Sequence, residues 1–304
     1  MTGQTTCVVS LDQSSASSSG GLTREQIATY HEEGYLFPVP ALKADEVLAV
    51  RNFIEGVEAT GGGKWPSQYA HKPHLLFRTL DEVIRHVAIL DVVESLLGRD
   101  ILCWSSRLFI KDSHDGGIVS WHQDLPYWGL DVSENIVTAW LALTPATRAN
   151  GVMKVVPRSH RRLVEHREAA ATNLLRRGQE IAVVVDEADA VAMTLQAGEF
   201  SLHHGLLFHG SDENRSGDRR VGFAIRYIPT RVRPLDGLPR DTATLVRGED
   251  RYHHFDLLSP PEYDLAAQAL LAQRRASAAS DRIRDLAAQR HREMVGDQSH
   301  GMRS

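Results

Sequence analysis

The chain has 304 residues and a formal net charge of −5, with 42% of its residues apolar and 24% charged. These values are typical of a globular protein and exclude collagen-like, coiled-coil and fully disordered chains. The sequence contains no run of 18 apolar residues, which excludes a membrane helix, and its net negative charge argues against a nucleic-acid partner.

The first third of the chain is predicted to be mainly helical. Residues 1–21 are rich in Ser and Gly and are expected to form a disordered tail. Thr23 and Gln26 form a capping box that predicts the start of a helix, and Gly34 suits its end. The predicted elements in chain order are a helix at 24–33, a strand at 35–37 ended by Pro38, and helices at about 44–58, 81–87 and 91–97.

From residue 101 onward, short apolar segments alternate with turn residues. Strands are predicted at 101–111, 136–143, 152–156, 181–185, 191–195, 200–208 and 221–228. Short strands at this density favour a β-sandwich or barrel. Helical segments are expected at about 163–178 and 261–296, the second packed outside the β core. We find no repeat or linker, and predict a single, mainly β domain with flanking helices over residues 22–304.

The segment from Ser120 to Trp128 contains His122 and Asp124, two residues apart. On an extended chain such residues point to the same face, so an imidazole and a carboxylate can bind one metal ion. They would form two corners of a 2-His-1-carboxylate triad, which leaves open positions on Fe(II) for O2 and a co-substrate. The third ligand must be a histidine from a neighbouring strand, and the candidates are His203, His204 and His209.

The strand predicted at 221–228 has two different faces. One face is apolar and is expected to pack against the outer helices; it carries Val221, Phe223, Ile225 and Tyr227. The opposite face carries Arg220, Gly222, Ala224 and Arg226. Two cations separated by the smallest side chains suit a strand that lines a small cavity and holds an anion there.

Together these segments resemble the phytanoyl-CoA dioxygenase-like family of Fe(II)/2-oxoglutarate oxygenases, and in particular bacterial members that act on small metabolites and natural products. The resemblance covers about residues 22–255. It rests on Trp121-His122-Gln123-Asp124, Asn150-Gly151, Pro157-Arg158-Ser159-His160, His209-Gly210-Ser211 with Asn214 and Ser216, and Arg220 to Tyr227. It implies a double-stranded β-helix, which is a jelly-roll core with flanking helices.

The resemblance also implies a role for each matching position. The iron ligands would be His122, Asp124 and His209, which leaves packing or hydrogen bonding for His203 and His204. The residues expected to bind 2-oxoglutarate are Arg220, Ser211 and Trp140. Arg220 matches the arginine that pairs with the distal carboxylate, because its planar fork grips a carboxylate with two hydrogen bonds. Arg219 is the neighbouring alternative, but strand alternation points it to the opposite face.

A substrate pocket is expected beside the metal ligands. Tyr127 and Trp128 follow Asp124 and either wall this pocket or pack in the core. Arg107 and Lys111 share a face of their strand and either meet an anionic substrate or are solvated. The predicted substrate-binding residues are Tyr127, Trp128, Arg226, Arg107 and Lys111.

The expected function is that of an Fe(II)- and 2-oxoglutarate-dependent dioxygenase that uses O2 to hydroxylate a small polar or anionic metabolite in specialised, natural-product biosynthesis. Desaturation, cyclisation or epimerisation would use the same centre. Halogenation is disfavoured because chloride would need the position that Asp124 fills. A metal-binding sensor without turnover is disfavoured because it needs no co-substrate arginine.

The cellular setting is predicted from the cysteines and the N-terminal sequence. Cys7 and Cys103 are the two cysteines, so a disulfide framework is excluded. Because no secretory segment is visible either, we expect a cytoplasmic location. The sequence gives no indication of the oligomeric state.

Overall fold

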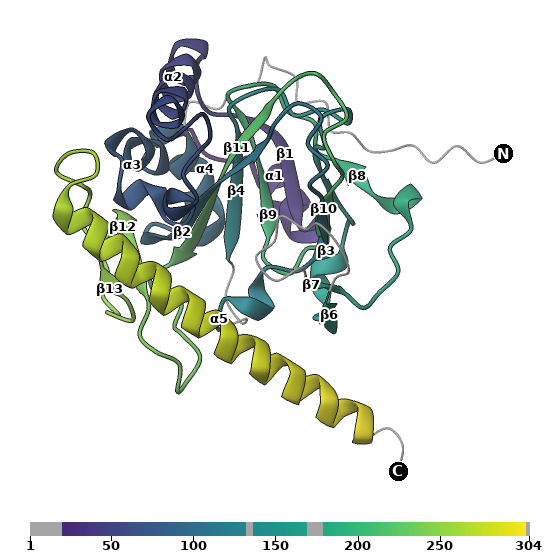
Figure 1. The fold of residues 1–304 in the computed structure, drawn as a ribbon. Helices are drawn as coiled ribbons and strands as arrows, with labels where there is room; N and C mark the ends of the chain where they lie inside the picture. Colours follow the sequence, from purple (N-terminus) through teal and green to yellow (C-terminus); the bar gives the residue numbers. More distant parts are fainter. Residues whose placement is uncertain (1–19, 132–135, 169–178, 302–304) are drawn as a thin grey trace.

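The computed structural model describes residues 20–131, 136–168 and 179–301. Its core consists of two facing sheets whose strands are mainly antiparallel (Figure 1). The larger sheet has the order β1 (Tyr35–Pro40), β9 (Glu199–His204), β4 (Val137–Ala142), β11 (Arg220–Pro229), β2 (Ile101–Lys111), β12 (Thr242–Arg247) and β13 (Asp256–Leu257). The smaller sheet has the order β3 (Val119–His122), β10 (His209–Ser211), β5 (Met153–Val155) and β8 (Val191–Ala192). This is the jelly-roll arrangement that the family resemblance implies, and it agrees with the sandwich or barrel that the strand pattern favours.

Helices cover the outer face of the larger sheet. They are α1 (Arg24–Glu33), α2 (Ala44–Thr60), α3 (Arg78–Ile84) and α4 (Val87–Leu97), and Figure 1 shows α2, α3 and α4 on the side away from the smaller sheet. The apolar face of β11, from Val221 to Tyr227, is buried in the same cluster as their side chains. The Tyr227 hydroxyl donates a hydrogen bond of 2.8 Å to the Ile84 carbonyl. The predicted division of β11 into two faces is therefore confirmed.

The polar face of β11 looks toward the smaller sheet. Gly222 lies opposite Ala142 on β4, and a side chain at Gly222 would overlap the Trp140 ring. The small residues of this strand therefore leave room for Trp140 between the sheets. Apolar side chains such as Val155 and Leu207 fill the rest of this layer, apart from a cavity described below.

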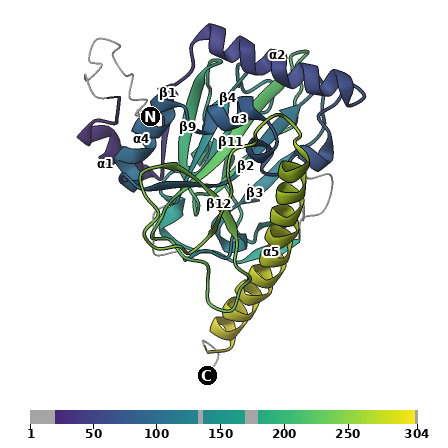
Figure 2. The ribbon, with the colours of Figure 1, turned by 90° about the vertical axis from the view of Figure 1, so that its left-hand side faces the viewer.

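The C-terminal helix α5 (Ala267–Gly301) runs along the outside of the β core, past β12 and β3 (Figure 2). Its Gln273 side chain donates a hydrogen bond of 2.8 Å to the His71 carbonyl, and Arg290 donates one of 2.6 Å to the Asp236 carbonyl. These contacts fix one face of α5 against loops of the core. None of the helices in the described ranges is long and apolar enough to cross a membrane.

Several predicted elements are confirmed with small shifts at their ends. The capping box of α1 is present, with the Gln26 amide and the Thr23 amide each bonded to the other residue's side chain, and Gly34 has a φ of 85°. The strand predicted at 101–111 matches β2. Residues 1–19 lie outside the described residues, so most of the predicted tail stays untested, as does the single domain.

Other predictions are wrong. The first strand does not end at Pro38 but continues to Pro40, because β1 is an edge strand and Pro38 needs no ladder partner there. The segment 200–208 is not one strand: the Leu207 amide donates to the His204 carbonyl in a turn, and the chain passes from the larger sheet to the smaller one. By contrast, the helical segment predicted at about 261–296 is confirmed as one helix, α5, with its ends at Ala267 and Gly301.

The insert after β5 also differs from its prediction. A helix was expected at 163–178, but β6 (His166–Glu168) pairs there with β7 (Gln179–Ile181) in a two-stranded sheet. The remainder of the predicted helix, residues 169–178, lies outside the described residues. The strand predicted at 181–185 ends at Ile181, its first residue. The predicted strand at 191–195 is reduced to Val191–Ala192.

Candidate active site

His122, Asp124 and His209 meet at one end of the smaller sheet. His122 is the last residue of β3 and is the register partner of His209, the first residue of β10. The Asp124 amide donates a hydrogen bond of 3.0 Å to the carbonyl of Gly205, in the turn between β9 and β10. The three side chains each offer a ligand atom within 4.8 Å of the others, and all three are buried. The structure thus brings together the residues predicted as metal ligands.

Both imidazoles are oriented by the backbone. His122 Nδ1 lies 2.9 Å from the Ser120 carbonyl, and His209 Nδ1 lies 2.9 Å from the Leu207 carbonyl. A carbonyl only accepts, so each Nδ1 carries the proton and donates, which leaves Nε2 with its lone pair free for a metal. Histidine ligands of metal sites are fixed in this way.

Asp124 completes the donor set as a carboxylate. Burial alone would raise its pKa, but Arg226, with Nη2 at 3.7 Å, together with His122 and His209 holds the pKa well below its usual range. Burial, and then the neighbouring His122, lower the pKa of His209 well below its ordinary value. Asp124 Oδ2 is buried and has no hydrogen-bond partner among the described residues. Two neutral imidazoles and one ionised carboxylate with an unsatisfied oxygen fit Fe(II) or a similar divalent ion.

A cavity of about 50 Å³ lies between the two sheets beside these ligands. It extends to Arg220, whose side chain lies over the Trp140 ring with Cζ 5.4 Å from the ring centroid. Arg220 is only 2% exposed, and burial lowers its pKa to about 10. It donates to the Gly151 carbonyl, but its Nε has no partner among the described residues. Ser211 lines the same end of the cavity.

Lys111 lies at the Arg220 end and not beside Tyr127 and Trp128. It is the register partner of Arg220 and donates a hydrogen bond of 2.8 Å to the Ser211 hydroxyl. Burial and then the charge of Arg220 lower the pKa of Lys111 to about 7. Two cations this close together suit an anion, and Lys111 lies with Arg220 and not with the other predicted substrate-binding residues. The pairing of β2 with β11 brings Lys111 beside Arg220, and the local sequence around Lys111 does not predict this pairing.

Arg219 points away from the cavity, as strand alternation predicts. Its Nη1 donates to Glu58 on α2 at 2.8 Å, and its Nε donates to Asp112 at 2.8 Å. Both carboxylates, and not 2-oxoglutarate, are therefore the partners of Arg219 in this structure.

A second, outer pocket of about 130 Å³ opens beside the metal ligands. His122, Asp124, Phe109 and Arg226 line both this pocket and the inner cavity. The predicted substrate residues that it contains are Tyr127, Trp128, Arg107 and Arg226. Sequence reasoning missed the remaining wall, which consists of His71, Trp104, Ser105, Ser280, Ile283 and Arg284. The last three come from α5, and nothing in the sequence around them indicates that this helix reaches the pocket.

The rival histidines occupy different surroundings. His203 faces the inner cavity, with its ring 4.8 Å from the ring of His209. His204 points elsewhere: its Nδ1 accepts a hydrogen bond of 3.1 Å from the Leu206 amide, and its ring lies 5.2 Å from that of His160. Burial lowers the pKa of both to about 4.

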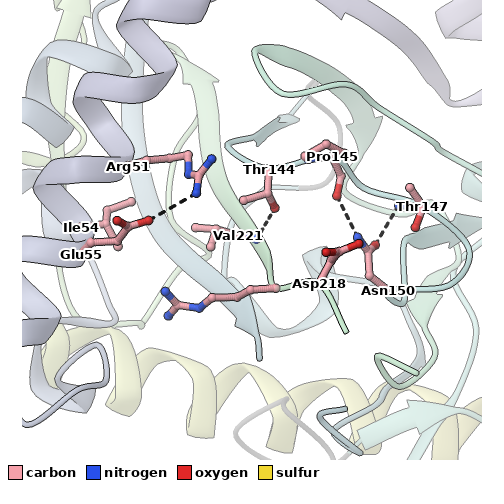
Figure 3. Close-up of a pocket in the computed structure, with 10 residues that line it drawn as sticks. Arg51, Ile54, Glu55, Thr144, Pro145, Thr147, Asn150, Asp218 and Val221 are labelled. Atoms are coloured by element: carbon pink, nitrogen blue, oxygen red, sulfur yellow. Dashed lines mark hydrogen bonds and ion pairs between the residues drawn. The ribbon is translucent and has the colours of Figure 1, made fainter. Parts of the chain in front are cut away.

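A larger cavity of about 360 Å³ lies between α2 and the start of β11, and several of its polar side chains already have protein partners. Figure 3 shows Arg51 paired with Glu55, and the Asn150 side chain bonded to Pro145 and Thr147. The Thr144 hydroxyl accepts from the Val221 amide at 2.8 Å. The cavity contains none of the three predicted metal ligands, and its Arg219 is paired with Glu58 and Asp112, which do not line it. We therefore assign no reaction to it.

Comparisons with known proteins agree with this geometry. The family model of phytanoyl-CoA dioxygenase matches residues 30–222. A probable alpha-ketoglutarate-dependent hypophosphite dioxygenase of Stutzerimonas stutzeri is 26% identical over 235 residues, which are 70% of this chain and 81% of that protein.

Two solved structures extend the comparison. The non-heme monooxygenase ThoJ is 36% identical with a TM-score of 0.76, over 87% of this chain and 99% of that chain. CytC3 with Fe(II) and alpha-ketoglutarate shares the fold at 23% identity, with a TM-score of 0.61 over 82% of this chain and 97% of that chain. Given the family match over most of the β core and the His-Asp-His donor set, the chain belongs to the phytanoyl-CoA dioxygenase family and is an Fe(II)- and 2-oxoglutarate-dependent dioxygenase.

Proposed function

We propose that this enzyme hydroxylates a small polar or anionic metabolite in specialised, natural-product biosynthesis. The observation that carries the proposal is the outer pocket, which shares His122 and Asp124 with the inner cavity and holds three arginines: Arg107, Arg226 and Arg284. The similarity to a monooxygenase and to a dioxygenase named for a small anion supports both the insertion of oxygen and the charge of the substrate.

The inner cavity would hold the metal and the co-substrate. His122, Asp124 and His209 would bind Fe(II), which with 2-oxoglutarate supplies the activation of O2. Arg220 would pair with the distal carboxylate, and Ser211 would donate a further hydrogen bond to it. Lys111 donates to the Ser211 hydroxyl and would add its positive charge from behind that residue. Trp140 would keep water away from the aliphatic part of 2-oxoglutarate, because its indole lies under the Arg220 guanidinium.

The outer pocket would hold the substrate against the metal ligands without contributing a ligand of its own. Trp104 and Trp128 form one wall, with ring centroids 5.0 Å apart, and Arg226 lies over the Trp128 ring. The Trp104 indole donates a hydrogen bond of 2.6 Å to Asp241, which fixes the wall from behind. Tyr127 and Arg107 would complete the contact surface. The aromatic side chains and the arginines of the pocket would together favour a compact anion.

Hydroxylation is favoured over halogenation because Asp124 is present and oriented toward the two histidines, with Oδ1 3.5 Å from His122 Nε2. A halide would need that position on the metal. Desaturation, cyclisation and epimerisation use the same donor set, and the product mass distinguishes them from hydroxylation.

The test is a screen of small anionic and polar metabolites with purified enzyme, Fe(II), 2-oxoglutarate and air. We expect a substrate that gains one oxygen atom in step with succinate formation. The matched control is Asp124→Ala, which removes one predicted ligand. A product that loses two hydrogens without gaining oxygen would replace hydroxylation by desaturation, and a product formed without O2 would contradict the oxygenase assignment.

A further inference from the structure

Three polar side chains form a row across the larger sheet, beside the metal ligands. Thr138 on β4 is the register partner of His203 on one side and of Arg226 on the other. All three side chains line the inner cavity. The next row along the sheet, with Trp140 and Ala224, carries no charge. The polar row is therefore a separate feature from the Arg220 end of the cavity.

The row contains more buried hydrogen-bonding groups than the structure satisfies. His203 is 1% exposed, and neither of its ring nitrogens has a hydrogen-bond partner among the described residues. The same holds for the Thr138 hydroxyl and for Arg226 Nε. A buried polar group without a partner costs free energy, so unsatisfied groups that share one cavity indicate a ligand with polar atoms.

The position of the row defines which part of a ligand it meets. The His203 ring lies 4.8 Å from the ring of His209, and Arg226 Nη2 lies 3.7 Å from Asp124 Oδ2. Arg220 stands at the opposite end of the same cavity. Hydrogen-bond donors therefore lie at both ends of the cavity, and the metal ligands form its side. This arrangement matches an elongated molecule with an anionic group at each end.

We propose that His203 and Thr138, next to Arg226, bind the carboxylate of 2-oxoglutarate that adjoins its ketone. This inference rests on the proposed role of Arg220, because the distal carboxylate must occupy the other end. A neutral imidazole and a hydroxyl each offer a donor to a carboxylate oxygen, and the nearby guanidinium adds positive charge. His203 is thus a binding residue for the co-substrate and no longer a rival ligand of the metal.

The experiment measures equilibrium binding by calorimetry under anaerobic conditions, with Fe(II)-loaded protein, so no turnover is needed. The ligands are 2-oxoglutarate and 2-oxobutyrate; the second keeps the keto acid but lacks the distal carboxylate. We expect His203→Phe to weaken both ligands by the same factor, about tenfold, as for a hydrogen bond to a charged group. Arg220→Lys should weaken 2-oxoglutarate alone. Fe(II) affinity should be unchanged in His203→Phe.

Two further variants guard against misfolding and indirect effects. Thr138→Val keeps the shape of the side chain and should weaken both ligands, and His203→Gln, which keeps a donor, should recover part of the loss. The matched control is Ser201→Ala on β9: its hydroxyl is also buried without a partner, but Ser201 is not among the residues that line the cavity. We expect wild-type affinities for this control.

The outcomes separate the two proposals. If wild-type protein binds 2-oxoglutarate but His203→Phe and Thr138→Val bind both ligands as tightly as wild type, the carboxylate subsite is wrong and the proposed function stands. A loss limited to 2-oxoglutarate would also overturn the subsite, since it would place the contact at the distal carboxylate. If Fe(II)-loaded wild-type protein fails to bind 2-oxoglutarate, both proposals fall.

Discussion

The inner cavity and the outer pocket share His122 and Asp124 but are built from different parts of the chain. The inner cavity is lined by strands that all lie before residue 230, most of them within the family match at 30–222. The outer pocket adds residues from the loop before α3 and from α5, which lies beyond that match. The predicted metal ligands thus belong to the core of the fold, whereas the pocket in which we propose that the substrate binds is completed by a helix outside that core.

The largest expected effect concerns the three predicted metal ligands, of which His122 and Asp124 line both pockets. His122→Ala, Asp124→Ala and His209→Ala should each abolish turnover with little change in melting temperature, because each removes a metal donor from a rigid strand end. Succinate formation and Fe(II) affinity are the measurements. Near-wild-type oxidation by any one variant at limiting Fe(II) would remove that residue from the metal site.

The next effect concerns only the inner cavity. Arg220→Ala should weaken 2-oxoglutarate by about 30-fold or more, since leaving a buried carboxylate unpaired costs ~2–5 kcal/mol. Arg220→Lys should lose less, because lysine keeps the charge but not the fork. The measurement is the 2-oxoglutarate dependence of succinate formation.

Arg219→Ala is the control for this prediction. It should lower the melting temperature, because Glu58 loses its partner, while 2-oxoglutarate affinity stays near wild type. The reverse result, with Arg219→Ala losing the co-substrate and Arg220→Ala keeping it, would mean that the two faces of β11 are exchanged.

A smaller effect should be confined to the outer pocket. Arg284→Ala is expected to raise the KM for the substrate about tenfold, as for a lost charged contact, and to leave 2-oxoglutarate affinity unchanged. The exposed Arg275 on the same helix provides the control Arg275→Ala, which should change neither value. Equal losses for substrate and co-substrate in Arg284→Ala would show that the two pockets are not independent.

The smallest effect is a pH dependence of co-substrate binding. Burial holds the pKa of Lys111 at about 7 in the ligand-free protein, so below that pH Lys111 is charged and ready for an anion. As pH rises through 7, binding must be accompanied by proton uptake, and 2-oxoglutarate affinity should fall by at most about tenfold per pH unit. Lys111→Met should flatten this slope between pH 7 and about 9, as measured by calorimetry in two buffers of different ionisation enthalpy; an unchanged slope would exclude Lys111 as its origin.

Sequence patterns are sufficient to predict site residues where those residues follow the two-residue period of a strand. The alternation of β11 locates the Arg220 face, because it depends only on the geometry of an extended chain. The spacing of His122 and Asp124 predicts that they share a site, but β3 ends at His122, and Asp124 lies in a turn with φ −76° and ψ −47° and not on an extended strand. The choice of His209 as third ligand depended on the family resemblance. Sequence patterns failed to predict the local structure where contacts between distant segments determine it. The turn that carries the chain from β9 to β10 looks like continuous strand in the sequence, since its residues Leu206, Leu207 and Phe208 are apolar.

The placement of Lys111 and of α5 depends on contacts between distant segments. Lys111 meets Ser211 only because β2 pairs in one register with β11 and the second sheet lies opposite. Ile283 and Arg284 have the spacing of an ordinary amphipathic helix, and no local pattern specifies which loop they cover. The residues of the proposed substrate pocket are therefore harder to predict from sequence than the predicted metal ligands.

The most direct test of the account is a single-turnover experiment on Fe(II)-loaded protein. The enzyme is mixed with 2-oxoglutarate without oxygen, freed of excess ligand, and then exposed to air while succinate is measured. The account predicts up to one succinate per Fe(II) in wild-type protein with its substrate present, and none in His209→Ala or without metal. Succinate formed at the same level by His209→Ala, or without O2, would contradict it.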